Sequence, residues 1–335
     1  MTLYCGIDLH SNNHVVVVID DQDKRLFERR LPNNLSATLE GLQPFKDELQ
    51  AVAVESTFNW YWLVDGLQEA GFDLRLVNTA AVKQYEGMKY RDDRHDAFWL
   101  AHLMRLDILP TGYIYPKAQR AVRDLLRRRM QLVRLSAGRL ISIQSQIWRS
   151  TGCRVSAKQV RKPDFELPLP AGYEHQAAQC MLNVQRTVQQ EIDTLEQTAL
   201  SVAQVAPAFK VLQSVTGIGP ILGMTIWLET GDISRFKSPG NYASYSRCVK
   251  SEHTSNGKKK GEGNRKAGNK YLSWAFSEAA HFAVRYDARA KRFFERKRAK
   301  TSGIVAIRAV AHKIARACYC MLRDQTPYDA TRVFG

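Results

Sequence analysis

The sequence has no long hydrophobic segment and no export signal at its start. No uninterrupted apolar run reaches the roughly 18 residues that a membrane-spanning helix requires. The opening residues, MTLYC, lack the basic stretch that begins a secretory signal peptide. We therefore expect a cytoplasmic protein that has no association with a membrane.

Two kinds of binding motif are also missing. The six cysteines are scattered, and none stands in the C-x-x-C spacing of a zinc site. We expect them to be reduced thiols, most of them buried. The G-x-x-x-x-G-K-[ST] loop that cradles the phosphates of ATP is absent as well. These absences argue against a structural zinc and against an ATP-driven reaction.

Acidic residues are scarce relative to basic ones. The chain has 33 Asp and Glu residues against 49 Lys and Arg residues, so its formal net charge is +16. A surplus of this size indicates a polyanionic partner. DNA or RNA fits better than an anionic membrane, because no segment is suited to a bilayer.

At 335 residues the chain is too long for one typical core. We predict an α/β domain at residues 1–115, a helical coiled-coil region at 116–205 and a mainly α-helical domain at 206–335. In the first domain, three antiparallel strands precede alternating helices and strands, a pattern that favours a ribonuclease H-like sheet over a doubly wound one. The predicted strands are 3–9, 14–20, about 25–31, 51–55 and 73–77, and the predicted helices are 35–49, which Pro44 would kink or interrupt, 58–70 and 93–106.

The middle of the chain carries two helical seams with apolar residues three and four positions apart. They are separated by proline and glycine at residues 152–172. The seams suit either two helices packed within one subunit or an arm that also pairs subunits. The first seam is Leu126, Met130, Val133, Ala137, Leu140, Gln144 and Ile147, and the second is Val188, Ile192, Leu195, Ala199 and Val202. The first of these helices is rich in arginine and has few acidic residues nearby in the sequence. This composition favours contacts with phosphates, for which Arg123 and Arg127 are our candidates.

The last third of the chain holds a glycine-rich turn and two basic tracts. Residues 215–220, VTGIGP, resemble a helix-hairpin-helix turn that brings backbone N–H groups to a phosphate, although an ordinary turn between helices fits equally well. The tract at 285–300 interleaves Tyr286, Phe293 and Phe294 with Lys and Arg. Basic side chains neutralise phosphates and aromatic rings stack on bases, so both tracts predict nucleic-acid binding. The candidates in the tract at 247–270 are Lys258, Lys259, Lys260, Arg265, Lys266 and Lys270.

Four carboxylates are the residues most indicative of chemistry. Asp8 lies inside the first apolar strand, Glu55 ends the apolar run AVAV, and Asp93 and Asp96 begin a helix. Acids in the first turn of a helix are common, but this does not account for an acid inside each of two apolar strands. A cluster of such acids is unfavourable without cations, and hard oxygen ligands suit Mg²⁺. Two such ions are the usual clamp for cutting or joining phosphodiesters.

The order of the motifs resembles that of the DEDD transposases of insertion sequences, a family also described as bridge-RNA-guided serine recombinases. The resemblance covers nearly the whole chain. It rests on GIDLH at 6–10, AVAVE at 51–55, DRHDA at 93–97, LQSVTGIGP at 212–220, FKSP at 236–239, SNGK at 255–258 and KAGNKYL at 266–272.

The resemblance implies a RuvC-like domain in which Asp8, Glu55, Asp93 and Asp96 hold Mg²⁺. It also implies that a serine of the C-terminal domain attacks the scissile phosphate, forms a covalent phosphoserine link and completes a composite site with these acids. The matching residue is Ser255, with Thr254 as the neighbouring alternative, because Asn256 stands where the family usually has glycine.

The same resemblance implies partners and a setting for the reaction. A structured noncoding guide RNA would pair with both donor and target DNA. The protein would form homo-oligomers, a dimer and then a tetramer in the synaptic complex, and would be bacterial and nucleoid-associated when bound to DNA. A covalent link would conserve the phosphodiester energy, so no ATP would be needed.

Three other functions fit parts of the sequence. A RuvC-like endonuclease, such as a junction resolvase, would hydrolyse DNA with the four acids alone. An actin-like sugar kinase also opens on G-I-D-L, but residues 10–13, HSNN, lack its glycine- and threonine-rich phosphate turn. A non-catalytic RNA-binding protein would need only the basic tracts.

Overall fold

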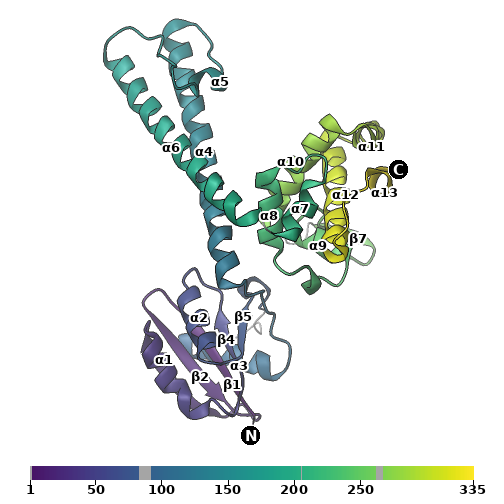
Figure 1. The fold of residues 1–335 in the computed structure, drawn as a ribbon. Helices are drawn as coiled ribbons and strands as arrows, with labels where there is room; N and C mark the ends of the chain where they lie inside the picture. The colour runs from purple at the N-terminus through teal and green to yellow at the C-terminus, as the bar shows by residue number, and fades with distance from the viewer. Residues whose placement is uncertain (1, 83–91, 205, 262–266) are drawn as a thin grey trace. The chain divides into compact units, whose positions relative to one another are not determined.

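The structure is a computed structural model that describes residues 2–82, 92–204, 206–261 and 267–335. The chain divides into two compact units, Met1–Lys117 and Ala118–Gly335 (Figure 1). The two central seams and the region after residue 206 both belong to the second unit.

The first unit is a mixed α/β sheet with helices on both faces (Figure 1). Its strands lie in the order β3-β2-β1-β4-β5, in which β1, β2 and β3 are antiparallel and β4 and β5 run parallel to β1. The helix predicted at 35–49 ends at Leu42, because Pro44 falls in a 3₁₀ turn that follows. The elements are β1 (Leu3–Leu9), β2 (Asn13–Ile19), β3 (Arg25–Pro32), α1 (Leu35–Leu42), β4 (Leu49–Glu55), α2 (Tyr61–Glu69), β5 (Leu74–Val77), a 3₁₀ turn (Thr79–Ala81) and α3 (Asp93–Arg105).

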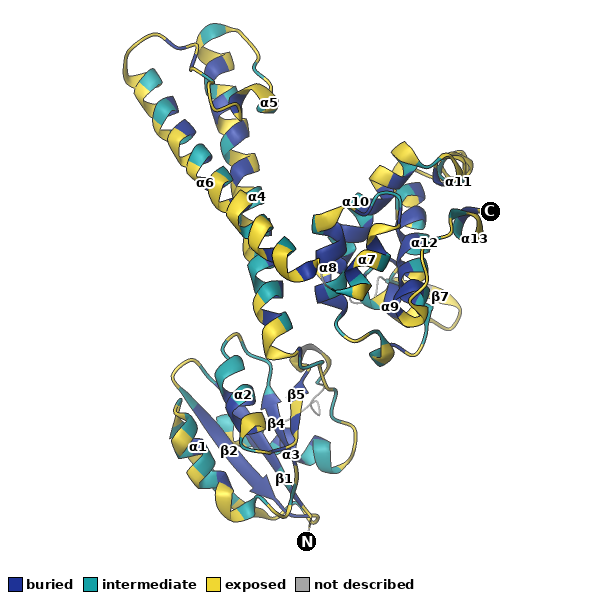
Figure 2. Ribbon diagram, viewed as in Figure 1, coloured by how far each residue is buried: buried dark blue, intermediate teal, exposed yellow. Residues whose placement is uncertain are grey.

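Alternation along the strands assigns their side chains to two faces. One face of β1 packs Cys5 and Ile7 against a cluster that includes residues of α1 and α2. Helix α3 covers the opposite face, where Ala97 and Ala101 pack on Val17. Strands β1 and β2 are buried on both sides (Figure 2), whereas β3 at the edge of the sheet is largely exposed. A polar side chain on β1 or β2 is therefore an exception that needs a partner.

Gly6 lets helix α3 approach the sheet closely. A Cβ atom added at Gly6 would lie 2.0 Å from the carbonyl oxygen of Ala97, which is backbone and cannot turn aside. Helix α3 therefore lies against the same face of β1 that carries Asp8. Its first turn is held by Asp92, whose side chain accepts a hydrogen bond from the backbone N–H of His95.

The second unit is almost entirely helical. Its elements are α4 (Lys117–Thr151), α5 (Ala157–Val160), α6 (Tyr173–Ala203), α7 (Pro207–Gln213), α8 (Pro220–Thr230), a 3₁₀ turn (Ile233–Arg235), α9 (Pro239–Tyr245), β6 (His253–Ser255), β7 (Lys258–Gly261), α10 (Lys270–Tyr286), α11 (Ala288–Arg298), α12 (Gly303–Asp324) and α13 (Ala330–Phe334). A mixed sheet followed by a mostly helical region is the fold class that the sequence predicts. The β6–β7 hairpin is an element that our reading of the sequence missed.

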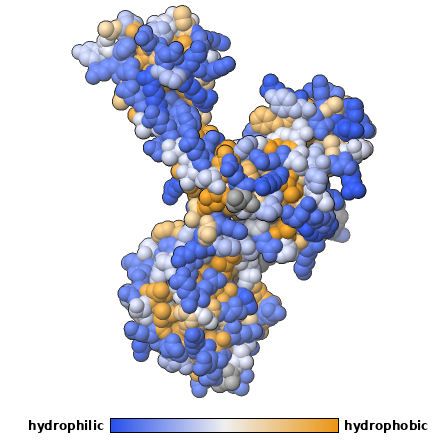
Figure 3. Space-filling view, viewed as in Figure 1, coloured by the Kyte–Doolittle hydropathy of each residue, from blue (hydrophilic) through white to orange (hydrophobic). Residues whose placement is uncertain are grey.

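The two long helices, α4 and α6, pack on each other through much of the two predicted seams, with corrections at three positions. Val202 is exposed and Ala203 is buried in its place, and Ile143 is fully buried where the seam named Gln144, which is half-buried. Leu140 and Ile147 of α4 are buried in a cluster with Ala178 and Leu182 of α6. The seam position assigned to Ala137 is exposed. Ser136 is buried instead, and its hydroxyl accepts a hydrogen bond from Gln185. Much of the surface of this helix pair in view is hydrophilic (Figure 3).

The remaining helices form the largest core of the chain, in which residues from α7 to α13 pack together. The predicted glycine turn joins α7 to α8 within this core. Gly217 has a φ of +102°, and a Cβ atom there would lie 2.5 Å from the carbonyl oxygen of Ala279 on α10. The packing of α10 against this turn accounts for the glycine without any contact to a phosphate.

Three of the six cysteines, Cys5, Cys248 and Cys318, are buried, and burial raises the pKa of each of their thiols. Cys153 and Cys180 are exposed, so the expectation that most of the thiols are buried is met by only half of them. Among the described residues, no helix is both long and apolar enough to cross a bilayer.

Candidate functional site

Neighbouring parallel strands bring Asp8 and Glu55 together. Ile7 of β1 pairs with Val54 of β4, so the residues that follow them lie side by side on the face covered by α3. The carboxyl groups of Asp8 and Glu55 share a hydrogen bond. Asp8 is only 5% exposed. Two carboxyl groups in contact imply either a shared proton or a cation.

Helix α3 adds Asp96 to this pair. Together with Asp8 and Glu55, Asp96 lines a cavity of about 360 Å³. The other lining residues are Thr79, Val82, Trp99 and Leu100. Three of the four predicted acids therefore face one cavity of the first unit.

The surroundings of Asp8 disfavour its charge in the absence of a cation. Burial is the largest cause. The hydrogen bond that the protonated Asp8 carboxyl donates to Glu55 and the nearby charges of Glu55 and Asp96 act in the same direction, raising the pKa of Asp8 to about 8. His10 opposes the shift. A carboxyl group that is neutral by default here becomes a strong ligand once a divalent cation supplies the missing positive charge.

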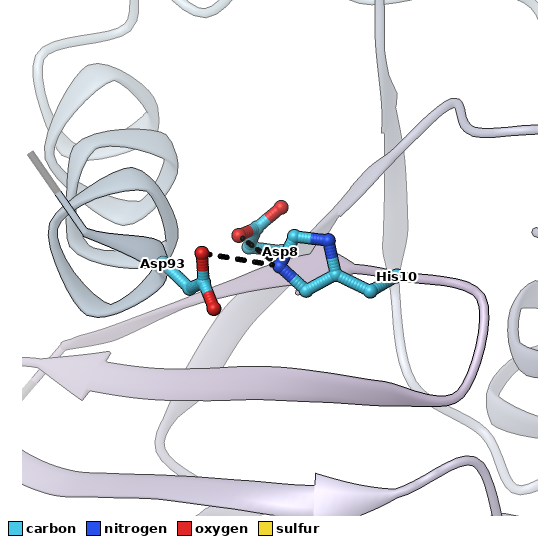
Figure 4. A group of neighbouring side chains, drawn as sticks. All are labelled: Asp8, His10 and Asp93. Carbon is cyan, nitrogen blue, oxygen red and sulfur yellow. Dashed lines mark ion pairs between the residues drawn. The ribbon is translucent and has the colours of Figure 1, made fainter.

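Asp93 lies beside Asp8 and shares His10 with it, but it also has a partner of its own in Arg30. His10 Nε2 is 3.1 Å from Asp8 Oδ2 and 3.4 Å from Asp93 Oδ1 (Figure 4). Arg30 of β3 donates to Asp93 Oδ2 at 2.5 Å, and this bond holds the pKa of Asp93 below its ordinary value. Asp93 is therefore a charged residue at the rim, and Arg30 partly balances it.

His10 is the site residue that our reading of the sequence missed, because we assigned it only to a turn. One ligand atom each from Asp8, His10 and Asp93 lie within 4.8 Å of one another, which is close enough to share a metal ion. The backbone carbonyl of His10 accepts hydrogen bonds from Asn33 and Asn59 at 3.0 and 2.9 Å. The signal in the sequence was an imidazole two positions after a buried acid.

These acids fit a divalent cation. Asp8 Oδ2 is buried and has no hydrogen bond from any described residue, and Glu55 and Asp96 supply further oxygen donors beside it. Oxygen donors suit hard cations such as Mg²⁺. With the described residues alone, His10 opposes the repulsion only in part, so the cluster must hold an extra proton or bear the remaining repulsion.

Ser255 lies on a hairpin of the second unit. It is the last residue of β6, it is exposed, and it pairs with Lys258 across a two-residue turn. Asn256 and Gly257 both have positive φ, +51° and +70°, as a type I′ turn requires. The Asn-Gly pair that departs from the family pattern is thus the preferred sequence for this turn. Thr254, the alternative hydroxyl, is exposed as well.

The predicted phosphate-binding arginines of α4 are engaged in packing. Arg123 is 5% exposed. Arg127 donates two hydrogen bonds, of 2.6 and 2.8 Å, to Glu229 on α8, which is 1% exposed. Arg129 donates to Glu196 on α6. The acids that balance this helix come from other helices, which is why α4 itself shows few of them.

The structure describes four of the six candidate basic residues in the tract at 247–270. Lys258 and Lys260 are exposed on the β6–β7 hairpin, and Lys270 is exposed at the start of α10. Lys259 lies on β7. Arg265 and Lys266 lie outside the described residues.

Comparison with known proteins identifies relatives of both units. A family model for DEDD transposases of the IS110 type, described as "Transposase", matches residues 5–147. A second, described as "Transposase IS116/IS110/IS902 family", matches residues 209–295. Together they cover about two thirds of the chain.

Two curated proteins are similar along much of the chain. A "Probable family 20 transposase" of Pseudomonas aeruginosa is 24% identical over 293 residues, 83% of this chain and 85% of that protein. A "Putative transposase y4qE" of Sinorhizobium fredii is 24% identical over 229 residues, 68% of this chain and 57% of that protein. The DEDD family is distinct from the serine recombinases, so that part of the expected family name is wrong.

Proposed function

We propose, from the premise that this chain belongs to the IS110 family of transposases, that it cuts and rejoins DNA with a divalent cation held by Asp8, Glu55 and Asp96. The observation that carries this proposal is the hydrogen-bonded pair of buried Asp8 and half-buried Glu55 beside Asp96 at one cavity. Such a cluster serves no packing purpose, and its charge is compensated once a cation is bound.

The chain's own groups have separate tasks in this proposal. Asp8, Glu55 and Asp96 hold the cation, for which we propose Mg²⁺, and Asp93 and His10 border it. When bound, the cation stabilises negative charge on the reacting phosphate. Arg30 keeps Asp93 ionised, and Asn33 and Asn59 fix the turn that carries His10.

A plasmid-cleavage assay tests the use of the acids. We expect Asp8→Asn to abolish nicking with Mg²⁺, because one ligand and one charge are lost. The matched control is Asp73→Asn, which changes an exposed carboxylate of the same unit. Full activity of Asp8→Asn would refute the proposal, and equal loss in both variants would point to damage of the fold.

We further propose that the hydroxyl of Ser255 is the nucleophile. Its Oγ–P bond forms as one P–O bond of the DNA breaks, the serine loses its proton and the departing oxygen gains one. Attack by the hydroxyl of another strand end reverses these changes, joins the new strand and frees the serine. The exposed position of Ser255 in the Asn-Gly hairpin and its match to the family motif support this role.

The Ser255 proposal is tested by denaturing gels of reactions on labelled DNA. We expect wild type to give a protein–DNA adduct that Ser255→Ala cannot form, and Thr254→Ala to form it normally. An adduct formed by Ser255→Ala but lost in Thr254→Ala would move the role to Thr254. Cleavage by Ser255→Ala without an adduct would favour hydrolysis, as in a junction resolvase.

We propose a structured noncoding guide RNA as the source of target choice. The net charge of +16 and the family resemblance support it. Sequencing the RNA that copurifies with the full chain tests the proposal: a single discrete species is expected, and a mixture that reflects total cellular RNA would contradict it.

We also propose that the protein acts as a dimer, and as a tetramer in the synaptic complex, with contacts between subunits on α4. Leu140 is engaged within the chain, whereas Ile141 and Trp148 are 63% and 50% exposed. Light scattering of Ile141→Lys should show a smaller mass than that of wild type. An unchanged mass would place the contact elsewhere.

A further inference from the structure

Two exposed aromatic rings lie next to each other near the end of α10. Phe282 is 43% exposed and Tyr286 is 64% exposed. Their centroids are 6.4 Å apart and their planes differ by 7°, so the rings are nearly parallel. The guanidinium of Arg285 lies 5.3 Å from the centroid of Tyr286. Neither ring belongs to the buried cluster of this unit.

Helix α11 follows directly and separates its aromatic residues from its basic ones. Phe293 and Phe294, which the sequence suggested as stacking residues, are half-buried against the core beside Ala290. A neighbouring side of the helix is basic. Arg289, Arg292 and Arg296 follow one another at intervals of three and four residues and are exposed, so they form a row along about 10 Å of helix.

The cations of this row have no acidic partner within the part of the chain that the structure describes. Among the described residues, no ion pair joins Arg289, Arg292 or Arg296 to an acid. Residues 285–300 contain eight Lys and Arg residues against two acids. Strongly hydrophilic residues dominate the view over α11 (Figure 3).

We propose that Phe282, Tyr286, Arg289, Arg292 and Arg296, here called the α10–α11 surface, bind single-stranded DNA. Unpaired bases stack on the two rings, and the arginines contact the phosphates. A duplex keeps its bases stacked on one another and offers no free base face to these rings. A second copy of the chain would bring the same positive charge and be repelled. The proposal rests on the proposed function, because exchanging strands exposes unpaired DNA.

The test measures the affinity of the full-length chain for a labelled single-stranded DNA and for a duplex of equal length by fluorescence anisotropy. We expect Phe282→Ala/Tyr286→Ala to weaken binding to the single strand about tenfold and binding to the duplex less than twofold. Tyr286→Phe keeps the ring and should bind as wild type does. Tyr173→Ala, at a 92% exposed tyrosine on α6, is the matched control.

The arginine row has its own signature. Arg289→Ala/Arg292→Ala should lower the slope of log affinity against log salt by about 1.4 for the single strand, since each lost phosphate contact removes about 0.7. An unchanged slope would show that these arginines do not contact the phosphates of the bound strand.

Other outcomes would overturn the assignment. These are an equal loss for duplex and single strand in the aromatic variant, a loss confined to an RNA of the same sequence, or a smaller mass by light scattering. The last would assign the surface to a second copy. Failure here leaves plasmid nicking and its dependence on Asp8 untouched, so the two proposals fail separately.

Discussion

The carboxyl groups of Asp8 and Glu55 share a hydrogen bond across two parallel strands. Such a bond needs a proton between two groups that are both ionised in water at neutral pH. The site is therefore a place where a proton and a divalent cation compete, and its behaviour should depend on both.

Asp8→Asn should raise the stability of the metal-free protein and lower its cleavage activity. The substitution keeps the shape of the side chain and removes the charge that burial disfavours. We expect the metal-free variant to unfold at a higher urea concentration than wild type at pH 8, with a gain of about 1 kcal/mol or more, and to lose at least about a hundredfold in cleavage rate. A variant less stable than wild type without metal would contradict the repelling cluster.

The stability of the metal-free protein should fall as pH rises. The pKa of Asp8 is about 8 in the folded chain against an ordinary value of 3.8, so the folded state retains a proton that the unfolded state releases. Between pH 5 and 7 this group should remove up to about 1.4 kcal/mol per pH unit, and above pH 8 its effect should level off. Urea unfolding in EDTA measures the slope, and the part due to Asp8 is the difference from Asp8→Asn. Parallel slopes for the two proteins would refute this assignment.

Gly6→Ala should destabilise the first unit, although Gly6 itself contributes no side chain to the site. The added methyl group would overlap the backbone oxygen of Ala97, and overpacking of this kind costs about 1–3 kcal/mol. It should also displace Asp96 and weaken Mn²⁺ binding measured by calorimetry. Gly138→Ala is the control, since nothing lies within 4 Å of its added Cβ atom. Equal melting temperatures for Gly6→Ala and wild type would show that α3 can shift without cost.

Arg127→Ala should lower the free energy of unfolding. It leaves Glu229 buried and without its bidentate partner, which typically costs about 3–5 kcal/mol. Arg128→Ala, an exposed neighbour, should change the unfolding free energy by less than about 0.5 kcal/mol. Urea unfolding compares the two. Should Arg127→Ala keep wild-type stability and instead reduce the salt dependence of DNA binding, the original phosphate interpretation would be restored.

Local patterns predicted most of the first unit because each element follows from its own residues. Apolar residues at every second position specify β1, an unbroken run of valines and an isoleucine specifies β2, and Pro44 marks where α1 must stop. The convergence of Asp8 with Glu55 was predictable too, because two apolar strands that each carry one acid on the same face meet in a sheet.

The remaining features depend on partners that are distant in the chain. Glu229 lies far in the sequence from Arg127, so counting charges along α4 could not reveal that the arginine was already paired. Ser136 is buried where the heptad favoured Ala137, because Gln185 supplies its hydrogen bond. In the sequence, Phe293, Phe294 and Tyr286 are all aromatic residues within one basic tract. Only the packing of α11 shows that the two phenylalanines face the core while Tyr286 is exposed. The Asn256-Gly257 turn was a local signal that we could have used.

The distribution of buried and exposed thiols suits the chain to fluorescent labelling at cysteine. Cys153 and Cys180 lie exposed near the connection between α4 and α6, whereas the buried thiols of Cys5, Cys248 and Cys318 stay protonated and unreactive towards maleimides. Fluorophores attached to the two exposed thiols, Cys153 and Cys180, would therefore gather at one end of the helix pair, whereas the half-buried thiol of Cys320 on α12 is less accessible. Energy transfer between labelled copies could then report when subunits assemble on DNA, with no substitution in either core.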